Sequence, residues 1–329
     1  MKTYAVIIPY YGCWPVYFPL FLKGVECNPQ LKVILITDLP MPKLPENVTL
    51  LKQPLQELKR RAEEVLQVPI CLERPFKLCD LKPMYGLIFQ EELAGVDYWG
   101  HGDVDLIFGN LDIVVQPLME QEYDVISFDK YWLSGPFCLY RNTEKCNNLF
   151  RRSPDWERVL QISRCVAFDE CAELWPILRQ GVPVETVPAP FQAMTQICFP
   201  AADRGEISCY HENHLKEEFE RKSEFCTYER GNFTCNGKNI FIYHFILAKS
   251  RWYFFFPRWN EVPDKFYITR TGFYTERALA WLWLIELVRY FFSLFRFIEM
   301  CREDIRERGF SAFFTRCYTA AKRVLKRRR

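Results

Sequence analysis

The stretch DYWGHGDVDLIFGNL, residues 97–111, places two acidic side chains at the end of an apolar and aromatic run. Asp103 and Asp105 are one residue apart, so in an extended chain their carboxylates point to the same side. Gly100 and Gly102 leave room for a ligand beside the backbone. Mg²⁺ and Mn²⁺ prefer oxygen ligands of this kind. The pattern indicates a cation site at a strand end, whereas a solvated acidic turn is the simpler alternative.

Strands and helices are expected to alternate along the chain before this stretch. The apolar periodicity and the Pro and Gly positions predict strands at 3–12, 31–38 and 48–53, and helices at 16–29, 54–67 and 80–93. This alternation is typical of a parallel, doubly wound sheet, in which ligands bind at the carboxyl ends of the strands. We therefore expect Asp38, which ends the second strand, to share one edge of an α/β sheet with Asp103 and Asp105.

The composition indicates a folded protein with a distinct C-terminal end. Of 329 residues, 49% are hydrophobic and 16% are aromatic, which excludes a disordered chain. The 14 cysteines include no CxxC spacing and indicate reduced, mostly buried thiols in the cytosol. Pro and Gly interrupt the first 18 residues too often for a secretory signal. We expect a large domain over residues 1–250 and an extension over 251–329.

The extension is aromatic and basic. Residues 270–329 carry 14 Lys and Arg against 6 Asp and Glu, although the net charge of the chain is only +2. The apolar run 277–300 contains Glu286, Arg289 and Arg296. Each charge costs about 2.5–3.5 kcal/mol at the centre of a bilayer, so amphipathic helices on an anionic membrane surface fit better than a spanning helix. Packing on its own domain or on a partner is the alternative. Basic residues are concentrated at the C-terminal end and not in the rest of the chain, which argues against nucleic-acid binding.

The sequence KLCDLKPMYGLIF, residues 77–89, followed by residues 97–111, resembles the DXD glycosyltransferases of the GT-A fold. It is most similar to a bacterial family of polysaccharide-building transferases with a Lys-Leu-Cys-Asp-x-Lys-Pro block before Trp-Gly-x-x-Asp-x-Asp. GPFCLYRN and FDE, at 135–142 and 168–170, match later blocks of that family. The resemblance covers roughly residues 1–250. It implies a Rossmann-like, mostly parallel central sheet with flanking helices, to which the chain adds a helical C-terminal extension.

The resemblance also implies which residues hold the ligands. It assigns a Mn²⁺ or Mg²⁺ ion to Asp103, Asp105 and His244, and a nucleotide-sugar donor, UDP-linked, to Pro9, Tyr10, Asp38, Lys77, Asp80, Lys82, Asp103 and Lys249. The DXD aspartates would hold the cation on the donor diphosphate, and Lys249 would reach the phosphate. The Gly and Pro that usually surround the late His/Lys pair are absent here.

Glycosyl transfer also needs a carboxylate near the acceptor hydroxyl, and Asp169 and Glu170 are the catalytic candidates. A structural role is open for both, because the helix dipole favours acids at a helix start. Asp129 is a weaker candidate.

The predicted function is a metal-dependent, hexosyltransferase-type glycosyltransferase. Its acceptor would be a cell-surface glycan (lipopolysaccharide, capsule or exopolysaccharide), free or lipid-linked, at the cytoplasmic face of the inner membrane. A nucleotidyltransferase acting on a sugar phosphate is the enzymatic alternative, although the chain has no Gly-rich triphosphate loop. The second alternative is a non-catalytic, membrane-bound scaffold with a degenerate fold.

Overall fold

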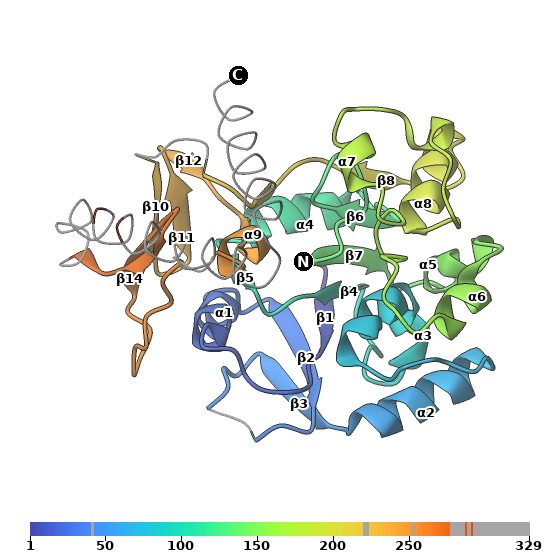
Figure 1. The fold of residues 1–329 in the computed structure, drawn as a ribbon, viewed down its shortest axis with the longest axis horizontal. Helices are drawn as coiled ribbons and strands as arrows, with labels where there is room; N and C mark the ends of the chain where they lie inside the picture. The colour runs from blue at the N-terminus through green and yellow to red at the C-terminus, as the bar shows by residue number, and fades with distance from the viewer. Residues whose placement is uncertain (41–42, 220–223, 252–253, 277–286, 288–290, 292–329) are drawn as a thin grey trace, which may run out of the picture.

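The computed structural model describes residues 1–40, 43–219, 224–251 and 254–276, together with Leu287 and Phe291. Its centre is a seven-stranded sheet with the order β3-β2-β1-β4-β7-β6-β8 (Figure 1). The strands are β1 (Tyr4–Pro9), β2 (Leu31–Thr37), β3 (Val48–Lys52), β4 (Tyr98–Gly102), β6 (Val125–Ser127), β7 (Phe137–Arg141) and β8 (Cys209–His211). Only the pairs made by β7, with β4 and with β6, are antiparallel in this sheet. The predicted α/β class with a mostly parallel sheet is confirmed, and the expected helical extension lies outside the described residues.

Helices cover both faces of this sheet. They are α1 (Phe18–Glu26), α2 (Leu55–Leu66), α3 (Tyr85–Ile88), α4 (Asp112–Glu120), α5 (Glu144–Asn147), α6 (Trp156–Gln161), α7 (Trp175–Leu178) and α8 (Met194–Asp203). Alternate residues of β1 enter different cores: Ala5 and Ile7 pack with α2 and α3, whereas Val6 and Ile8 pack with α1 and α4. The apolar run of β1 is therefore buried on both faces, as its sequence predicts.

The helix expected over residues 80–93 differs from the prediction. Residues Pro75–Met84 form a 3-10 helix, and only the short α3 follows it. Pro83 has no backbone N–H to donate and clashes with a preceding α-helical turn, which disfavours a continuous α-helix here. The tighter 3-10 turns carry Lys77, Asp80 and Lys82 inward, where all three side chains are buried.

A smaller sheet lies beside the main one, beyond α1 in Figure 1. Its order is β12-β11-β10-β14-β15, built from β10 (Phe225–Glu229), β11 (Asn232–Cys235), β12 (Lys238–Asn239), β14 (Lys265–Thr269) and β15 (Gly272–Tyr274). Strands from both sides of residue 250, where the sequence analysis ends the domain, therefore pair in one sheet.

A three-stranded ladder connects the two sheets. It has the order β5-β13-β9 and consists of β5 (Leu106–Phe108), β9 (Leu215–Lys216) and β13 (Ile242–His244), with the one-turn helix α9 (Ile246–Lys249) directly after β13. The antiparallel register sets His244 opposite Leu106. This pairing brings His244, the last residue of β13, close to Asp105, which directly precedes Leu106.

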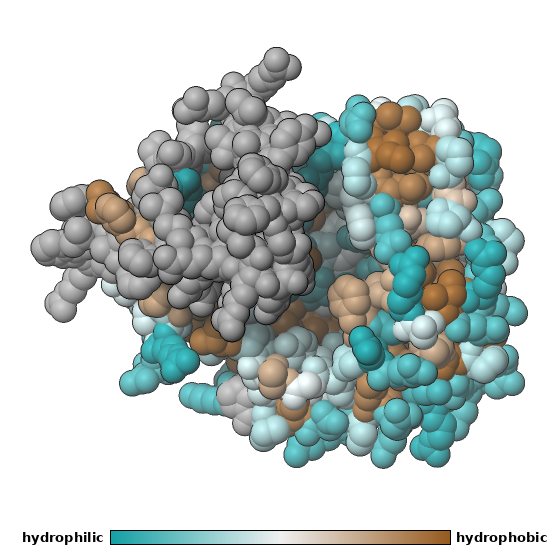
Figure 2. All heavy atoms as spheres, in the orientation of Figure 1, coloured by the Kyte–Doolittle hydropathy of each residue, from teal (hydrophilic) through white to brown (hydrophobic). Residues whose placement is uncertain are grey.

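The surface of the described residues is mixed in character. Figure 2 shows hydrophilic residues over much of the α2 side of the viewed face, and a hydrophobic patch over the α7–α8 region. Ile177 of α7 is 41% exposed and contributes apolar surface. Among the residues that the structure describes, no helix combines the length and the apolar character needed to cross a bilayer.

Candidate active site

Three side chains that can bind a metal ion meet at the carboxyl end of β4. Asp103 directly follows β4, Asp105 directly precedes β5, and His244 ends β13. One potential ligand atom from each residue lies within 4.8 Å of the others. The structure therefore brings together the DXD aspartates and the late histidine, which are far apart in sequence. The two carboxylates are ligands that suit Mn²⁺ or Mg²⁺, and the imidazole adds a nitrogen ligand of the kind that transition-metal ions bind.

Asp105 is the electrostatic centre of this cluster. Its side chain is 5% exposed, and its Oδ2 lies 2.7 Å from Lys249 Nζ and 3.5 Å from His244 Nε2. Burial would raise the pKa of Asp105, but His244 and Lys249 hold this pKa below its usual value. Asp105 therefore stays ionised and available to a cation at neutral pH.

His244 is held from its other side by Glu217, whose Oε1 lies 2.9 Å from His244 Nδ1. Burial would lower the pKa of His244, but Asp105 and Glu217 raise it to about 9. The Nε2 atom is buried and makes no hydrogen bond in the structure. A buried nitrogen of this kind beside two carboxylates fits a metal ligand, because a bound cation would supply its missing partner.

Lys82 connects the aspartate pair to a second acidic group. Its Nζ donates to Asp103 Oδ1 and to the carbonyl oxygen of Gly135, each at 2.8 Å, and lies 3.5 Å from Asp169 Oδ2. Burial would lower the pKa of Lys82, but Asp103 and the other nearby groups raise it well above its usual value. A permanent positive charge therefore lies between Asp103 and Asp169.

Glu170 is fixed by two hydrogen bonds. Its Oε1 accepts from the backbone N–H of Gly135 at 3.0 Å, and its Oε2 accepts from Trp175 Nε1 at 2.7 Å. Desolvation by the surrounding protein raises the pKa of Glu170 to about 7, although Lys82 opposes this shift. Burial also raises the pKa of Asp169, which is only 3% exposed. Glu170 therefore has the environment expected of a group that exchanges protons near neutral pH.

Lys77 and Asp80, which the resemblance assigns to the donor site, are buried in the protein interior. Both side chains are fully buried, and Lys77 Nζ lies 2.8 Å from Asp80 Oδ2. Asp80 accepts from the backbone N–H of Val166 at 3.0 Å and of Phe168 at 2.8 Å. The pair thereby fixes the loop immediately before Asp169, so its contribution to the site comes through the placement of that loop.

A family model matches this chain over residues 6–277. That model describes DUF6625, a family of unknown function. The chain belongs to this family. A search of curated proteins gave no match.

Among solved structures, the DUF6625 chain is similar to the apo form of mouse xyloside xylosyltransferase 1. The two share 9% identity with a TM-score of 0.37, over 74% of this chain and 96% of the other. A likeness this distant assigns no activity, so the function of the DUF6625 chain has to be argued from its own side chains.

The loop after β1 borders the same edge of the sheet in the DUF6625 chain. Pro9 ends β1, and the Tyr10 ring stacks on Trp14 with 5.1 Å between centroids. Trp14 in turn stacks on Phe18 at 4.0 Å. Asp38 follows β2 and is exposed. Pro9, Tyr10 and Asp38, which the resemblance assigns to the nucleotide-sugar donor, thus lie at the edge where the carboxyl ends of β1, β2 and β4 meet.

Two residues that contact the site, Glu217 and Trp175, were not predicted from the sequence. Glu217 and Trp175 make direct hydrogen bonds to His244 and Glu170. Glu217 lies in the charged run KEEFERK, which reads as a solvated surface segment, so no sequence signal marks it. Asp129, the weaker catalytic candidate, instead accepts from the backbone N–H of Tyr131 at 2.8 Å.

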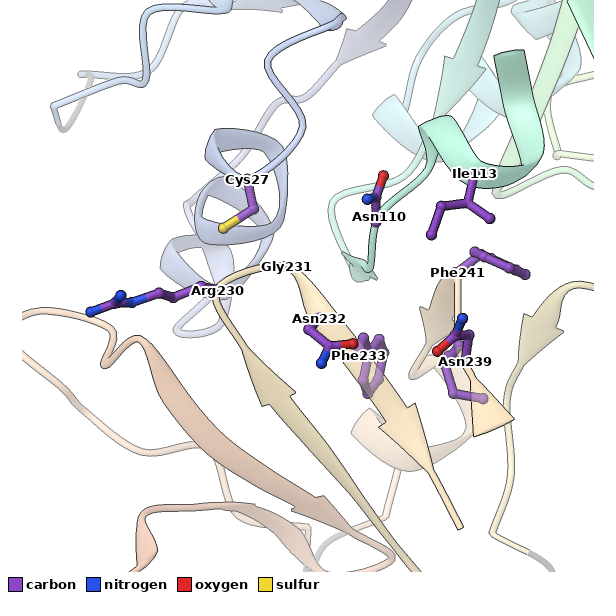
Figure 3. Close-up of a pocket in the computed structure, with 10 residues that line it drawn as sticks. Cys27, Asn110, Ile113, Arg230, Gly231, Asn232, Phe233, Asn239 and Phe241 are labelled. Atoms are coloured by element: carbon purple, nitrogen blue, oxygen red, sulfur yellow. The ribbon is translucent and has the colours of Figure 1, made fainter. Parts of the chain in front are cut away.

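A cavity of about 260 Å³ lies away from this site (Figure 3). It is lined by Cys27, Asn110, Ile113, Arg230, Gly231, Asn232, Phe233, Asn239, Ile240 and Phe241. Ile240 and Phe241 precede β13, and Asn110 follows β5, so the cavity lies at the end of the β5–β13 pair remote from His244. None of the candidate site residues lines it.

Proposed function

We propose that this chain is a metal-dependent glycosyltransferase that moves a sugar from a nucleotide-sugar donor to a glycan acceptor. The observation that carries the proposal is the Asp103, Asp105 and His244 cluster at the carboxyl end of β4. Parallel sheets bind their ligands at this edge. The lysines Lys82 and Lys249 lie 2.8 Å and 2.7 Å from the two aspartates, so the site combines a cation position with fixed positive charge.

This combination suits a diphosphate leaving group. A bound Mn²⁺ or Mg²⁺ would neutralise negative charge on the diphosphate as the sugar departs. Lys249 is 34% exposed beside Asp105 and extends the positive charge toward the donor phosphate. Tyr10 and Asp38 border the place of the nucleoside. In this proposal the donor is UDP-linked.

Asp169 and Glu170 are the proposed catalytic carboxylates at the acceptor side. Glu170 remains partly exposed while Asp169 is buried, which makes Glu170 the better placed of the two to take a proton from an acceptor hydroxyl. The hydrogen bonds from Gly135 and Trp175 fix its orientation, because each carboxylate oxygen is held by its own donor.

The acceptor and location that we propose rest on the sequence. The acceptor is a cell-surface glycan (lipopolysaccharide, capsule or exopolysaccharide), free or lipid-linked. The aromatic and basic residues after 277 would hold the protein on the anionic cytoplasmic face of the inner membrane. These residues lie outside the described structure.

A nucleotide titration tests the proposal. UDP, GDP, CDP and TDP are titrated into the full chain with Mn²⁺ and with chelator, in the wild type, in Asp105→Asn and in the control Asp203→Asn, an exposed acid in α8. We expect metal-dependent binding of one nucleotide that is lost in Asp105→Asn and kept in Asp203→Asn. Absence of binding under every condition would contradict the proposal and favour a scaffold. Pyrophosphate release from a nucleoside triphosphate and a sugar phosphate would favour a nucleotidyltransferase.

A further inference from the structure

Glu217 occupies a position next to the proposed metal site without belonging to it. It directly follows β9, which pairs with β13 in parallel. Its Oε1 lies 2.9 Å from His244 Nδ1, and its Oε2 lies 3.5 Å from an Arg179 nitrogen at the end of α7. The Glu217 side chain is 27% exposed, whereas that of His244 is 5% exposed. Glu217 is therefore the link between the buried imidazole and the rim of the site.

The chemistry of this contact fixes the tautomer of His244. An ionised carboxylate can only accept hydrogen bonds, so the contact requires an N–H on Nδ1. A cation that binds Nε2 displaces the proton there, which leaves the single N–H of the neutral ring on Nδ1 and directs the Nε2 lone pair to the cation. The Nε2 atom lies 3.5 Å from Asp105 Oδ2 and makes no hydrogen bond. The lone pair is thus presented on the side of the aspartates.

We propose that Glu217 is a positioning residue that directs His244 Nε2 to the cation, and that Arg179 holds Glu217 in place. This inference rests on the proposed metal site of the transferase. A carboxylate on the second nitrogen of a ligating histidine fixes the ring orientation and raises the basicity of the ligand, and its loss typically costs 10–100-fold in metal affinity. The contact of Glu217 with Arg179 explains why the acid faces His244 although solvent is within reach.

The test measures Mn²⁺ binding to the full chain, without nucleotide or acceptor, by electron paramagnetic resonance of the free ion. We expect Glu217→Ala to raise the Kd for Mn²⁺ by 10–100-fold. Glu217→Gln keeps an acceptor but loses the charge, so its loss of affinity should be smaller. The matched control is Glu218→Ala, because Glu218 is the next residue, is 54% exposed, and pairs with Arg251 instead.

A second readout separates positioning from a general structural role. In pulsed resonance spectra, the coupling between Mn²⁺ and a histidine nitrogen should be present in the wild type and in Glu218→Ala, and be lost or weakened in Glu217→Ala. Should Glu217→Ala fail to fold, Glu217→Gln carries the test through both readouts. An unchanged Kd and an unchanged nitrogen coupling in the Glu217 variants would overturn the inference.

The same experiment distinguishes failure of the inference from failure of the proposed function. If Asp105→Asn abolishes Mn²⁺ binding while both Glu217 variants bind like the wild type, the metal site stands and the role of Glu217 is refuted. If the wild type binds no Mn²⁺ with or without UDP, the metal-dependent function and the inference are both refuted.

Discussion

Raising the pH from 6 to 9.5 in the presence of chelator should destabilise this protein through His244. The surrounding carboxylates raise the pKa of His244 from 6.5 to about 9. A group with a raised pKa contributes its full stabilisation below its unfolded pKa and loses it as the pH rises through its folded pKa. The difference of about 2.5 units corresponds to about 3 kcal/mol, at 1.36 kcal/mol per unit. His244 should therefore add about 3 kcal/mol to the free energy of unfolding at pH 6, and this contribution should be lost above pH 9.

The assay is urea unfolding of the wild type and of His244→Gln at several pH values between 6 and 9.5. Thiols and other groups also titrate in this range, so the measured quantity is the difference between the two proteins at each pH. His214→Gln is the control, because burial lowers the pKa of His214 and its contribution therefore changes only around and below its unfolded value of 6.5, well below the pH at which His244 deprotonates. A wild-type curve that runs parallel to that of His244→Gln from pH 6 to 9.5 would refute the assigned role of Asp105 and Glu217.

Two further predictions concern the loop that carries the catalytic candidates. Lys77→Met leaves the buried carboxylate of Asp80 without its ion-pair partner and should cost about 3–5 kcal/mol in urea unfolding. Lys59→Met removes a partly exposed ion pair on α2 and should cost under about 1 kcal/mol. Equal losses would contradict this. Gly135→Ala places a Cβ 2.5 Å from Glu170 Oε1, so the Glu170 carboxylate has to move. We expect transferase activity to fall sharply, while the free energy of unfolding falls by only about 1–3 kcal/mol. An unchanged kcat would contradict a catalytic role of Glu170.

The parts of the fold that the sequence predicts are those fixed by local patterns. The apolar runs of β1 and β2 and the amphipathic pattern of α2 depend on neighbouring residues, and the structure confirms them within a few positions. The 3-10 helix Pro75–Met84 escaped prediction because its inward charges contact residues distant in the sequence, from 21 residues away for Lys82 with Asp103 to 86 for Asp80 with Val166.

The candidate site likewise contains residues that a local pattern predicts and residues that only the tertiary structure brings together. Asp103 and Asp105 are recognisable because their spacing follows a buried strand. The sequence also offers His244 and Lys249, but only through a family resemblance, since the contact with Asp105 spans 144 residues. His101, two residues before Asp103, is fully buried within β4. Burial in a strand interior is a tertiary property that spacing alone does not encode.

The origin of the cluster from distant segments has a consequence for folding. Asp105 belongs to the first half of the chain, whereas His244 arrives on β13 only when the three-stranded ladder has formed. Such high contact order makes this one of the slower junctions to assemble. A cation held by both segments would act as a reversible cross-link, because it would bind the paired state of β5 and β13 and not a separated one. The free ion concentration would then set, by mass action, how often β13 separates from β5.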